Sequence, residues 1–92
     1  MKKKNGQKYV PERIRRKLSQ GYIIRTLREL KGWTQEKLSK ECGIAATNIS
    51  MLEHERLELG KERAIKLARA LGVHPATLMF PDITATEFLK AA

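Results

Sequence analysis

Residues 46–54 carry side chains whose types and spacing suit recognition of hydrogen-bonding groups. On an ideal helical wheel, Ile49, Leu52 and Glu53 share one face. The other side carries small and medium side chains with little charge, namely Ala46, Thr47, Asn48, Ser50, Met51 and His54. An asparagine can bond adenine through N6 and N7, and Ala, Thr and Met side chains can touch the methyl group of thymine. The chemistry that this face could do is the reading of base edges in a DNA major groove.

Four residues of this face are candidate base contacts, namely Ala46, Thr47, Asn48 and Met51. The alternative for Ala46 and Met51 is that they only pack against neighbouring side chains. No arginine lies on the face, so we do not expect this helix alone to make a strong guanine contact. Candidate contacts to the DNA backbone are Thr34, Ser50, His54, Arg56 and Lys31. For Arg56 and Lys31 the alternative is an ordinary solvated charge.

The elements that must position this face are two short helices joined by a tight turn, between Trp33 and Glu53. Thr34 is a good N-cap, because its hydroxyl can accept an amide N–H that the first turn leaves unpaired. Trp33 and Leu38 hold the two positions of a hydrophobic staple around that cap. Gly43 can adopt the left-handed conformation that ends a helix. The sequence therefore predicts a helix, a turn and a second helix.

Three more helices are predicted around this motif. The first starts near Ser19 or Gln20 and ends by Lys31, and its inner stripe is formed by Ile23, Ile24, Leu27 and Leu30. The next runs from Lys61 to Leu71, and the last opens at His74–Pro75 and stops at Pro81. The predicted fold class is therefore all-α, with five helices in a domain that spans residues 19–81.

The two ends of the chain are predicted as separate segments. Residues 1–18 form a basic tail that we expect to be disordered or partly helical, as a solubilising tail or a phosphate-binding arm. Residues 82–92 are predicted to form a C-terminal helix, because Thr84 to Glu87 resembles a capping box. This helix would either pack on the domain or meet its twin in a dimer, and we favour the dimer.

Charge is unevenly distributed along the chain. The formal net charge is +9, from 19 basic and 10 acidic residues. Residues 1–31 hold 11 of the basic residues and two of the acidic ones, so they carry all of the net charge. A polyanionic partner is the natural inference from this distribution.

The same composition argues against several other classes of protein. The 92 residues suit one small domain, and the single cysteine excludes an internal disulfide or a cysteine-rich zinc site. We expect Cys42 to be a small buried hydrophobe. The sequence has only two histidines and offers no nucleophile–base pair or metal cluster, so we expect no metal, no cofactor and no enzyme activity. The sequence has no apolar run that could be a secretory signal or a membrane span, so we expect a cytoplasmic protein.

The segment from Ile24 to Val73 resembles the helix-turn-helix of the phage-repressor family, also called Cro/C1 or Xre. The resemblance lies in Ile24, Leu27, Arg28, Lys31-Gly32-Trp33-Thr34-Gln35-Glu36, Leu38, Gly43-Ile44, Ile49-Ser50, Leu52-Glu53 and Leu67-Ala68-Arg69-Ala70-Leu71. It implies an ion pair between Arg28 and Glu53. It also implies that Gln35, beside Thr34, contacts a phosphate and braces the start of the second motif helix.

Two positions depart from the family pattern. Ala45 stands where the family often has a Ser or Thr N-cap, which predicts a weaker helix start. After Glu53 the family has a turn rich in Asn, Gly and Pro, whereas this chain has His54-Glu55-Arg56. We therefore expect the second motif helix to run on to about Arg56.

The resemblance implies a sequence-specific DNA-binding transcriptional regulator that represses as a homodimer. One alternative is the antitoxin of a toxin–antitoxin pair, which would also repress its own operon and would wrap a toxin protein with its basic tail. A further alternative is a protein-interaction module that has lost DNA binding.

Overall fold

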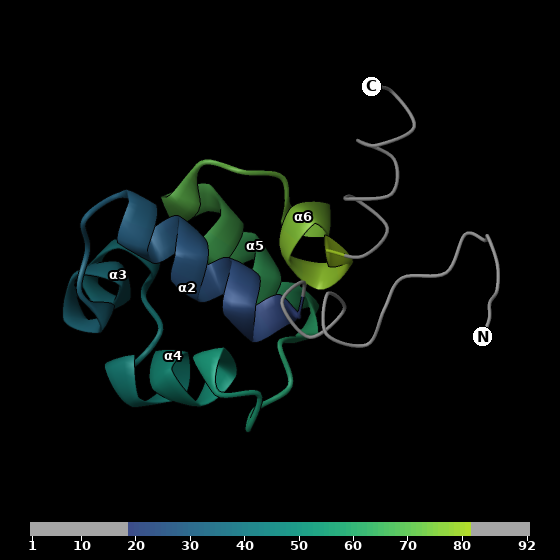
Figure 1. The fold of residues 1–92 in the computed structure, drawn as a ribbon, viewed down its shortest axis with the longest axis horizontal. Helices are drawn as coiled ribbons and strands as arrows, with labels where there is room; N and C mark the ends of the chain where they lie inside the picture. Colours follow the sequence, from purple (N-terminus) through teal and green to yellow (C-terminus); the bar gives the residue numbers. More distant parts are fainter. Residues whose placement is uncertain (1–18, 82–92) are drawn as a thin grey trace, which may run out of the picture.

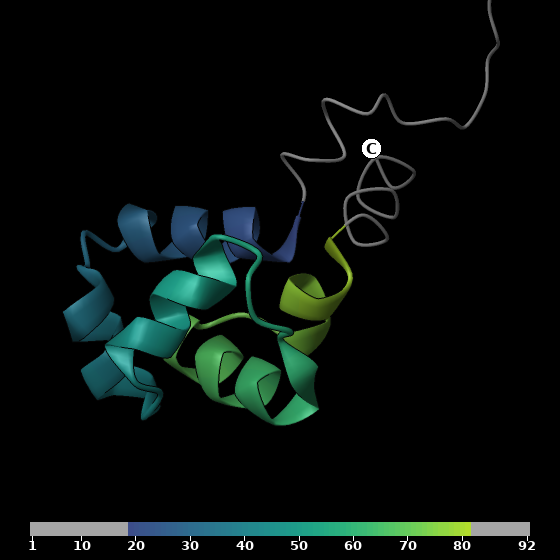
Figure 2. The same cartoon turned by 90° about the horizontal axis from the view of Figure 1, so that it is seen from below.

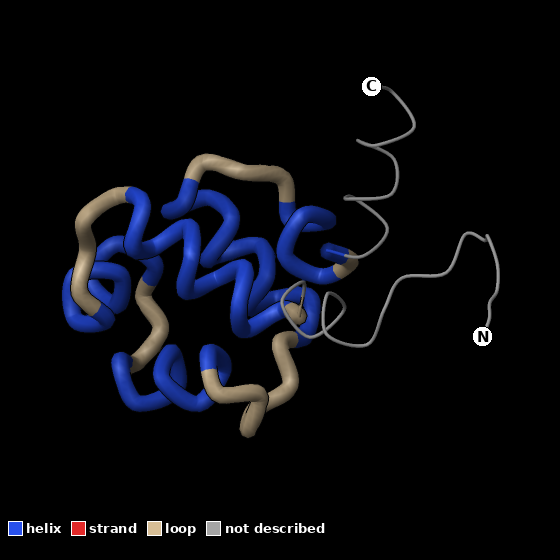
Figure 3. Tube along the Cα trace, viewed as in Figure 1, coloured by secondary structure: helices blue, strands red, loops and turns tan. Residues whose placement is uncertain are grey.

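The structure, a computed structural model, describes residues 19–81 as five helices (Figure 1). Their bounds are α2 (Gln20–Leu30), α3 (Gln35–Cys42), α4 (Ala46–Glu53), α5 (Gly60–Leu71) and α6 (Pro75–Met79). Between residues 19 and 81 all regular elements are helices joined by loops (Figure 3), so the predicted all-α, five-helix fold is confirmed. The predicted tail and C-terminal helix lie outside the described residues. None of the described helices is long and apolar enough to cross a membrane.

The core is built from side chains of all five helices and of the loops between them. Its buried members are Ile24, Leu38, Cys42, Ile44, Ile49, Leu52, Leu59, Ala64, Leu67, Ala68, Leu71 and Leu78. Leu57 packs against this core from the α4–α5 loop. Leu30 was predicted to be buried but is 78% exposed, since it is the last residue of α2 and the chain turns away after it. A helical wheel predicts the direction of a side chain but not whether a partner helix reaches it.

The helix ends follow the capping pattern of the sequence at most positions. The Thr34 hydroxyl accepts a hydrogen bond from the Lys37 amide at 3.0 Å, and Gly43 ends α3 with φ 78°. Ala45 makes no side-chain capping bond at the start of α4, as predicted. His74 caps α6, because its Nδ1 accepts a hydrogen bond from the Ala76 amide at 3.0 Å.

The prediction that α4 continues to about Arg56 is wrong. The helix ends at Glu53, and two residues later Glu55 adopts the left-handed conformation with φ 60°. The Glu55 amide then donates to the Leu52 carbonyl at 3.1 Å, and the Arg56 amide donates to the Met51 carbonyl at 2.8 Å. This pair of bonds is a Schellman motif, which usually places a glycine at the left-handed position. Left-handed backbone costs a residue with a side chain about 1–2 kcal/mol, so the sequence did not signal the turn.

The backbones of α2 and α4 come very close together at Gly21. A Cβ built at Gly21 would lie 2.5 Å from the Leu52 carbonyl oxygen and 2.6 Å from the Glu53 carbonyl oxygen. Real Cβ atoms essentially never approach other atoms this closely. The absence of a side chain at Gly21 therefore allows the first turn of α2 to touch the last turn of α4.

Substitution of Gly21 tests this contact. Alanine is favoured over glycine in a helix by up to about 1 kcal/mol, so an open site would gain stability in Gly21→Ala. We expect the opposite, a loss of about 1–3 kcal/mol in the free energy of unfolding, because the helices must separate. Urea denaturation measures it. Gly32→Ala is the comparison, because it shows the cost of a substitution without a steric clash. Nothing lies within 4 Å of the Gly32 Cβ position, and only the φ of 72° opposes the change. A Gly21→Ala variant more stable than the native chain would contradict the contact.

Candidate nucleic-acid interface

Helix α4 buries one side and leaves the other open. Figure 1 shows α4 along one edge of the structure, and in Figure 2, which looks from below, α4 lies in front of α2 and α5. Ile49 and Leu52 are buried in the core, whereas Thr47 is exposed. The other candidate base and backbone contacts of the helix, namely Ala46, Asn48, Ser50 and Met51, are half-buried. The helix therefore keeps an open face without acidic side chains beside a buried hydrophobic one.

One side of this open face borders a hollow shared with the start of α3. The hollow has a volume of about 310 Å³ and is lined by Gln35, Glu36, Ala46, Thr47, Ser50 and Met51. It brings together three of the four candidate base contacts with Gln35 and Ser50, which were predicted to contact the DNA backbone. The first turn of α3 and the open face of α4 therefore form one continuous concave surface.

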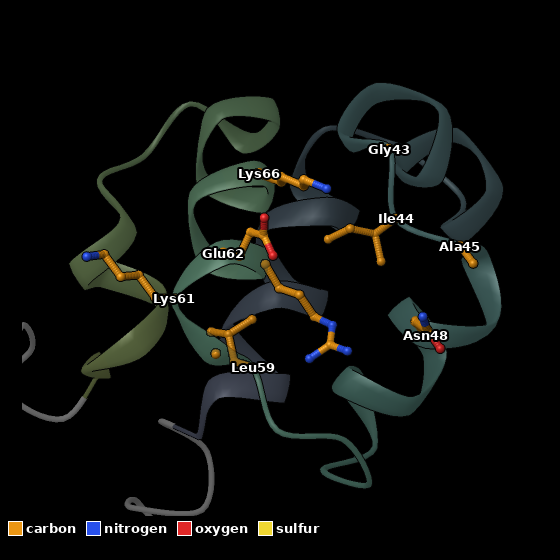
Figure 4. Close-up of a pocket in the computed structure, with 10 residues that line it drawn as sticks. Gly43, Ile44, Ala45, Asn48, Leu59, Lys61, Glu62 and Lys66 are labelled. Carbon is orange, nitrogen blue, oxygen red and sulfur yellow. The ribbon is translucent and has the colours of Figure 1, made fainter.

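Asn48 lies on a different hollow from the other three candidate base contacts. This second hollow has a volume of about 450 Å³ and lies between the α3–α4 turn and the start of α5 (Figure 4). Its basic lining residues are Lys61, Arg63 and Lys66. In Figure 4 Lys66 extends towards the α3–α4 turn, while Lys61 points away from Asn48.

Arg63 and Lys66 are residues that the sequence reasoning missed. The Arg63 Nη1 donates a hydrogen bond to the Glu58 carbonyl at 2.9 Å, which ties its side chain to the α4–α5 loop. The two residues are three positions apart on the polar side of α5, and that spacing is the signal that could have found them. The α5 side of the open face therefore carries the basic Arg63 and Lys66 together with the acidic Glu62, which lines the same hollow.

A buried ion pair fixes the C-terminal end of α4. Arg28 Nε lies 2.7 Å from Glu53 Oε2, and Arg28 Nη2 lies 3.0 Å from Glu53 Oε1. The two side chains are only 11% and 3% exposed. Hydrogen bonding to Glu53 raises the pKa of Arg28 above its ordinary value, and this effect exceeds the opposing effect of burial. The pair is therefore a charged, bidentate link between α2 and α4.

Two further hydrogen bonds complete this link. The Arg28 Nη1 donates to the Trp33 carbonyl at 2.8 Å, and the Gln35 Nε2 donates to Glu53 Oε1 at 3.0 Å. The resemblance implied that Gln35 braces the start of the second motif helix, but in the structure it bonds the last residue of α4. Ala46 at the helix start offers only a methyl group, so the Gln35 amide has no side-chain partner there.

The other candidate backbone contacts lie around these hollows. The His54 Nδ1 is 2.8 Å from the Ser50 carbonyl, and His54 shares a hollow of about 230 Å³ with Arg25, Arg28, Gln35 and Glu53. The Lys31 ammonium lies 5.0 Å from the centroid of the Trp33 ring, a cation–π contact at the α2–α3 turn. Thr34 is exposed at the start of α3, and Arg56 is exposed in the loop after α4.

Cys42 is buried, and burial raises the pKa of its thiol, which disfavours the reactive thiolate. Between residues 19 and 81 no group of three or more His, Cys, Asp or Glu side chains could hold a metal ion.

The Arg28–Glu53 pair is tested by removing one partner and then both. Arg28→Ala leaves a buried carboxylate unpaired, so we expect it to lower the free energy of unfolding by about 3–5 kcal/mol. The double variant Arg28→Met, Glu53→Leu removes both charges and should recover most of that loss. Urea denaturation measures all three chains. Arg25→Ala is the control, because the Arg25–Glu29 pair is exposed and should change stability by less than about 1 kcal/mol. Equal losses in Arg28→Ala and Arg25→Ala would contradict the role of the buried pair.

Comparisons with known proteins agree with this geometry. The profile of the helix-turn-helix family matches residues 24–78. A hypothetical transcription factor of Neisseria meningitidis serogroup B is 38% identical over 60 residues, which make up 65% of this chain and 57% of that protein. The crystal structure of the hypothetical transcription factor NHTF from Neisseria is similar with a TM-score of 0.70 and 31% identity, covering 94% of this chain and 95% of that one. The match to the curated relative spans less than two thirds of its length. Because the family profile covers more than half of the sequence, the chain belongs to the Cro/C1-type helix-turn-helix family.

Proposed function

We propose that the chain is a sequence-specific DNA-binding transcriptional regulator that places α4 in the major groove. The observation that carries this proposal is the open face of α4, which is free of acidic side chains and lies beside two hollows. Thr47 and Met51 would read bases from the middle of this face, with Ala46 beside them and Asn48 towards α5. The relatives described as hypothetical transcription factors support the same function.

The DNA backbone would be contacted on both sides of α4. The contacts proposed from the sequence lie in α3, α4 and the turns next to them, namely Thr34, Gln35, Ser50, His54, Arg56 and Lys31. The unpaired amides in the first turn of α3 favour a phosphate there. On the α5 side Arg63 and Lys66 add positive charge next to Asn48. Phosphate contacts of this kind set the register of the protein on the duplex, while the base contacts provide specificity.

The regulator would act as a homodimeric repressor. Two copies of α4 would then sit about 34–36 Å apart, which is one turn of DNA, and would occlude a promoter. The support for a dimer is the spacing of four residues that would share one face of the predicted C-terminal helix, namely Ala85, Phe88, Leu89 and Ala92. These residues lie outside the described part of the structure. Sedimentation of the full chain on a palindromic duplex reports the stoichiometry.

The basic tail would strengthen binding without adding specificity. The tail joins the domain at Ser19, whose hydroxyl lies 2.6 Å from a Glu55 carboxylate oxygen just after the end of α4. Residues 1–17 hold eight Lys and Arg side chains and one acid. Their attachment next to the proposed reading helix supports a contact with the phosphates that flank the site.

Substitutions on the open face of α4 test the reading helix. Asn48→Ala should cost about 1–3 kcal/mol on a duplex selected from a random pool, and Met51→Ala should weaken the preference for thymine. Arg69→Ala is the control, because it removes an exposed charge from the last turn of α5 and should act equally on all duplexes. Affinities for selected and scrambled duplexes are measured at one salt concentration, with circular dichroism to verify the fold. If the α4 variants weaken both duplexes equally, α4 is not the reader.

Removal of residues 1–17 tests the tail. The plot of log affinity against log salt has a negative slope, and each phosphate contact that is lost reduces its magnitude by about 0.9. We expect a shallower slope and little change in discrimination between selected and random DNA. A full-length chain with glutamine at the eight basic positions of residues 1–17 should show the same slope as the truncated chain, because the charge of the tail and not its length causes the salt dependence. An unchanged slope would assign the tail to another partner, such as the toxin that an antitoxin binds.

A further inference from the structure

The turn that ends α4 places a carboxylate in an unfavourable backbone conformation. Glu55 is the one non-glycine residue with positive φ between residues 19 and 81, and the other positive-φ positions there are glycines. A glycine at this position would form the same Schellman turn without strain. Backbone strain of this kind persists where the surrounding contacts require the side chain.

The Glu55 side chain reaches the first turn of α2. Its Oε2 accepts a hydrogen bond from the Ser19 hydroxyl at 2.6 Å and another from the Gly21 amide at 2.8 Å. The first turn of α2 contains no acidic residue of its own. Glu55 therefore supplies, from the far end of α4, the negative charge that a helix N-terminus favours.

We propose that Glu55 is a positioning residue for DNA reading, which sets the angle of α4 by tying its C-terminal turn to the first turn of α2. The inference rests on the proposed function of α4. It assigns to Glu55 a role that a glycine in the same turn could not perform.

Two ties join the C-terminal end of α4 to α2, namely the Arg28–Glu53 pair and the hydrogen bonds of the Glu55 side chain. Their positions explain why one tie alone does not set the angle of α4. Arg28 holds Glu53 near the end of α2, and Gly21 receives Glu55 near its start. These two residues are seven positions apart in α2, which is about 10 Å along the helix axis. With the Arg28–Glu53 tie alone, only the core packing of Ile49 and Leu52 would resist a rotation of α4 about its last residue. Two separated ties also define the direction of the helix.

A small pivot would be enough to disturb reading. Ala46 is seven residues from Glu53, so a rotation of about 10° about Glu53 moves the start of α4 by about 2 Å. Hydrogen bonds to bases tolerate only a few tenths of an ångström. Ala45 provides no capping bond that would hold the start of the helix in place. The polar contacts that add to core packing in setting the direction of α4 therefore lie at its C-terminal end.

The test compares variants of Glu55 in the full chain. Glu55→Gly keeps the left-handed turn and removes the tie, whereas Glu55→Gln keeps a hydrogen-bond acceptor of the same length. Glu58→Gln is the matched control, because it removes an exposed acid from the same loop. The readout is the ratio of affinities for selected and scrambled duplexes at one salt concentration. Loss of a negative charge strengthens binding to both duplexes, and the ratio cancels that effect.

We expect Glu55→Gly to lower the ratio about ten-fold, as the loss of one base contact would. Glu55→Gln should stay within about three-fold of the native ratio, and Glu58→Gln should equal it. Thermal unfolding is followed in parallel. If Glu55→Gly does not fold, Glu55→Asn replaces it with the same expectation, because asparagine tolerates the left-handed region and is too short to keep the tie.

The outcomes separate this inference from the proposed function. A native chain that discriminates, with an undiminished ratio in folded Glu55→Gly or Glu55→Asn, overturns the positioning role alone. A native chain that binds both duplexes equally overturns the proposed function and this inference with it. If neither variant folds, Glu55 is required for stability and the positioning role is overturned.

Discussion

The buried carboxylate of Glu53 is the point on which the arrangement of the candidate interface depends. It accepts hydrogen bonds from Arg28 of α2 and from Gln35 of α3, so one side chain joins three helices. A carboxylate that is 3% exposed would be strongly destabilising without these partners. Helix α4 has only eight residues and no side-chain cap at its start, so packing and this pair must hold it. Core packing and the Arg28–Glu53 pair hold the buried side of α4, so its opposite side can remain open to a partner.

Charge and shape are divided between different parts of the chain. Residues 19–81 contain ten basic and seven acidic side chains, a modest excess, whereas most of the net +9 belongs to the tail. In the proposed function the tail contributes salt-dependent attraction to any duplex, and α4 contributes discrimination between duplexes. Strong non-specific charge on α4 itself would oppose discrimination. The small, uncharged side chains Ala46, Thr47 and Met51 suit this division.

The sequence by itself determined the features that depend on neighbours within one or two helical turns. Thr34 and Gly43 mark the ends of α3, and both act as their residue types predict. The apolar spacing identified the five helices and most of the core, because a helix exposes one stripe to its partners at every turn. The resemblance to repressors indicated Arg28 and Glu53 as partners, and the structure contains that pair. The candidate base contacts also came from the sequence, and they remain a prediction.

Apart from the Arg28–Glu53 pair, the tertiary structure decided the features that join residues far apart in the chain. The end of α4 could not be predicted, because the left-handed turn at Glu55 is unfavourable locally and is compensated by bonds to Ser19 and Gly21. Asn48 shares a hollow with α5 rather than with Thr47, a separation that a helical wheel does not reveal. Short-range capping and periodicity are encoded within a few residues. A strained turn or a shared hollow depends on which helices meet, and only the packed fold specifies that.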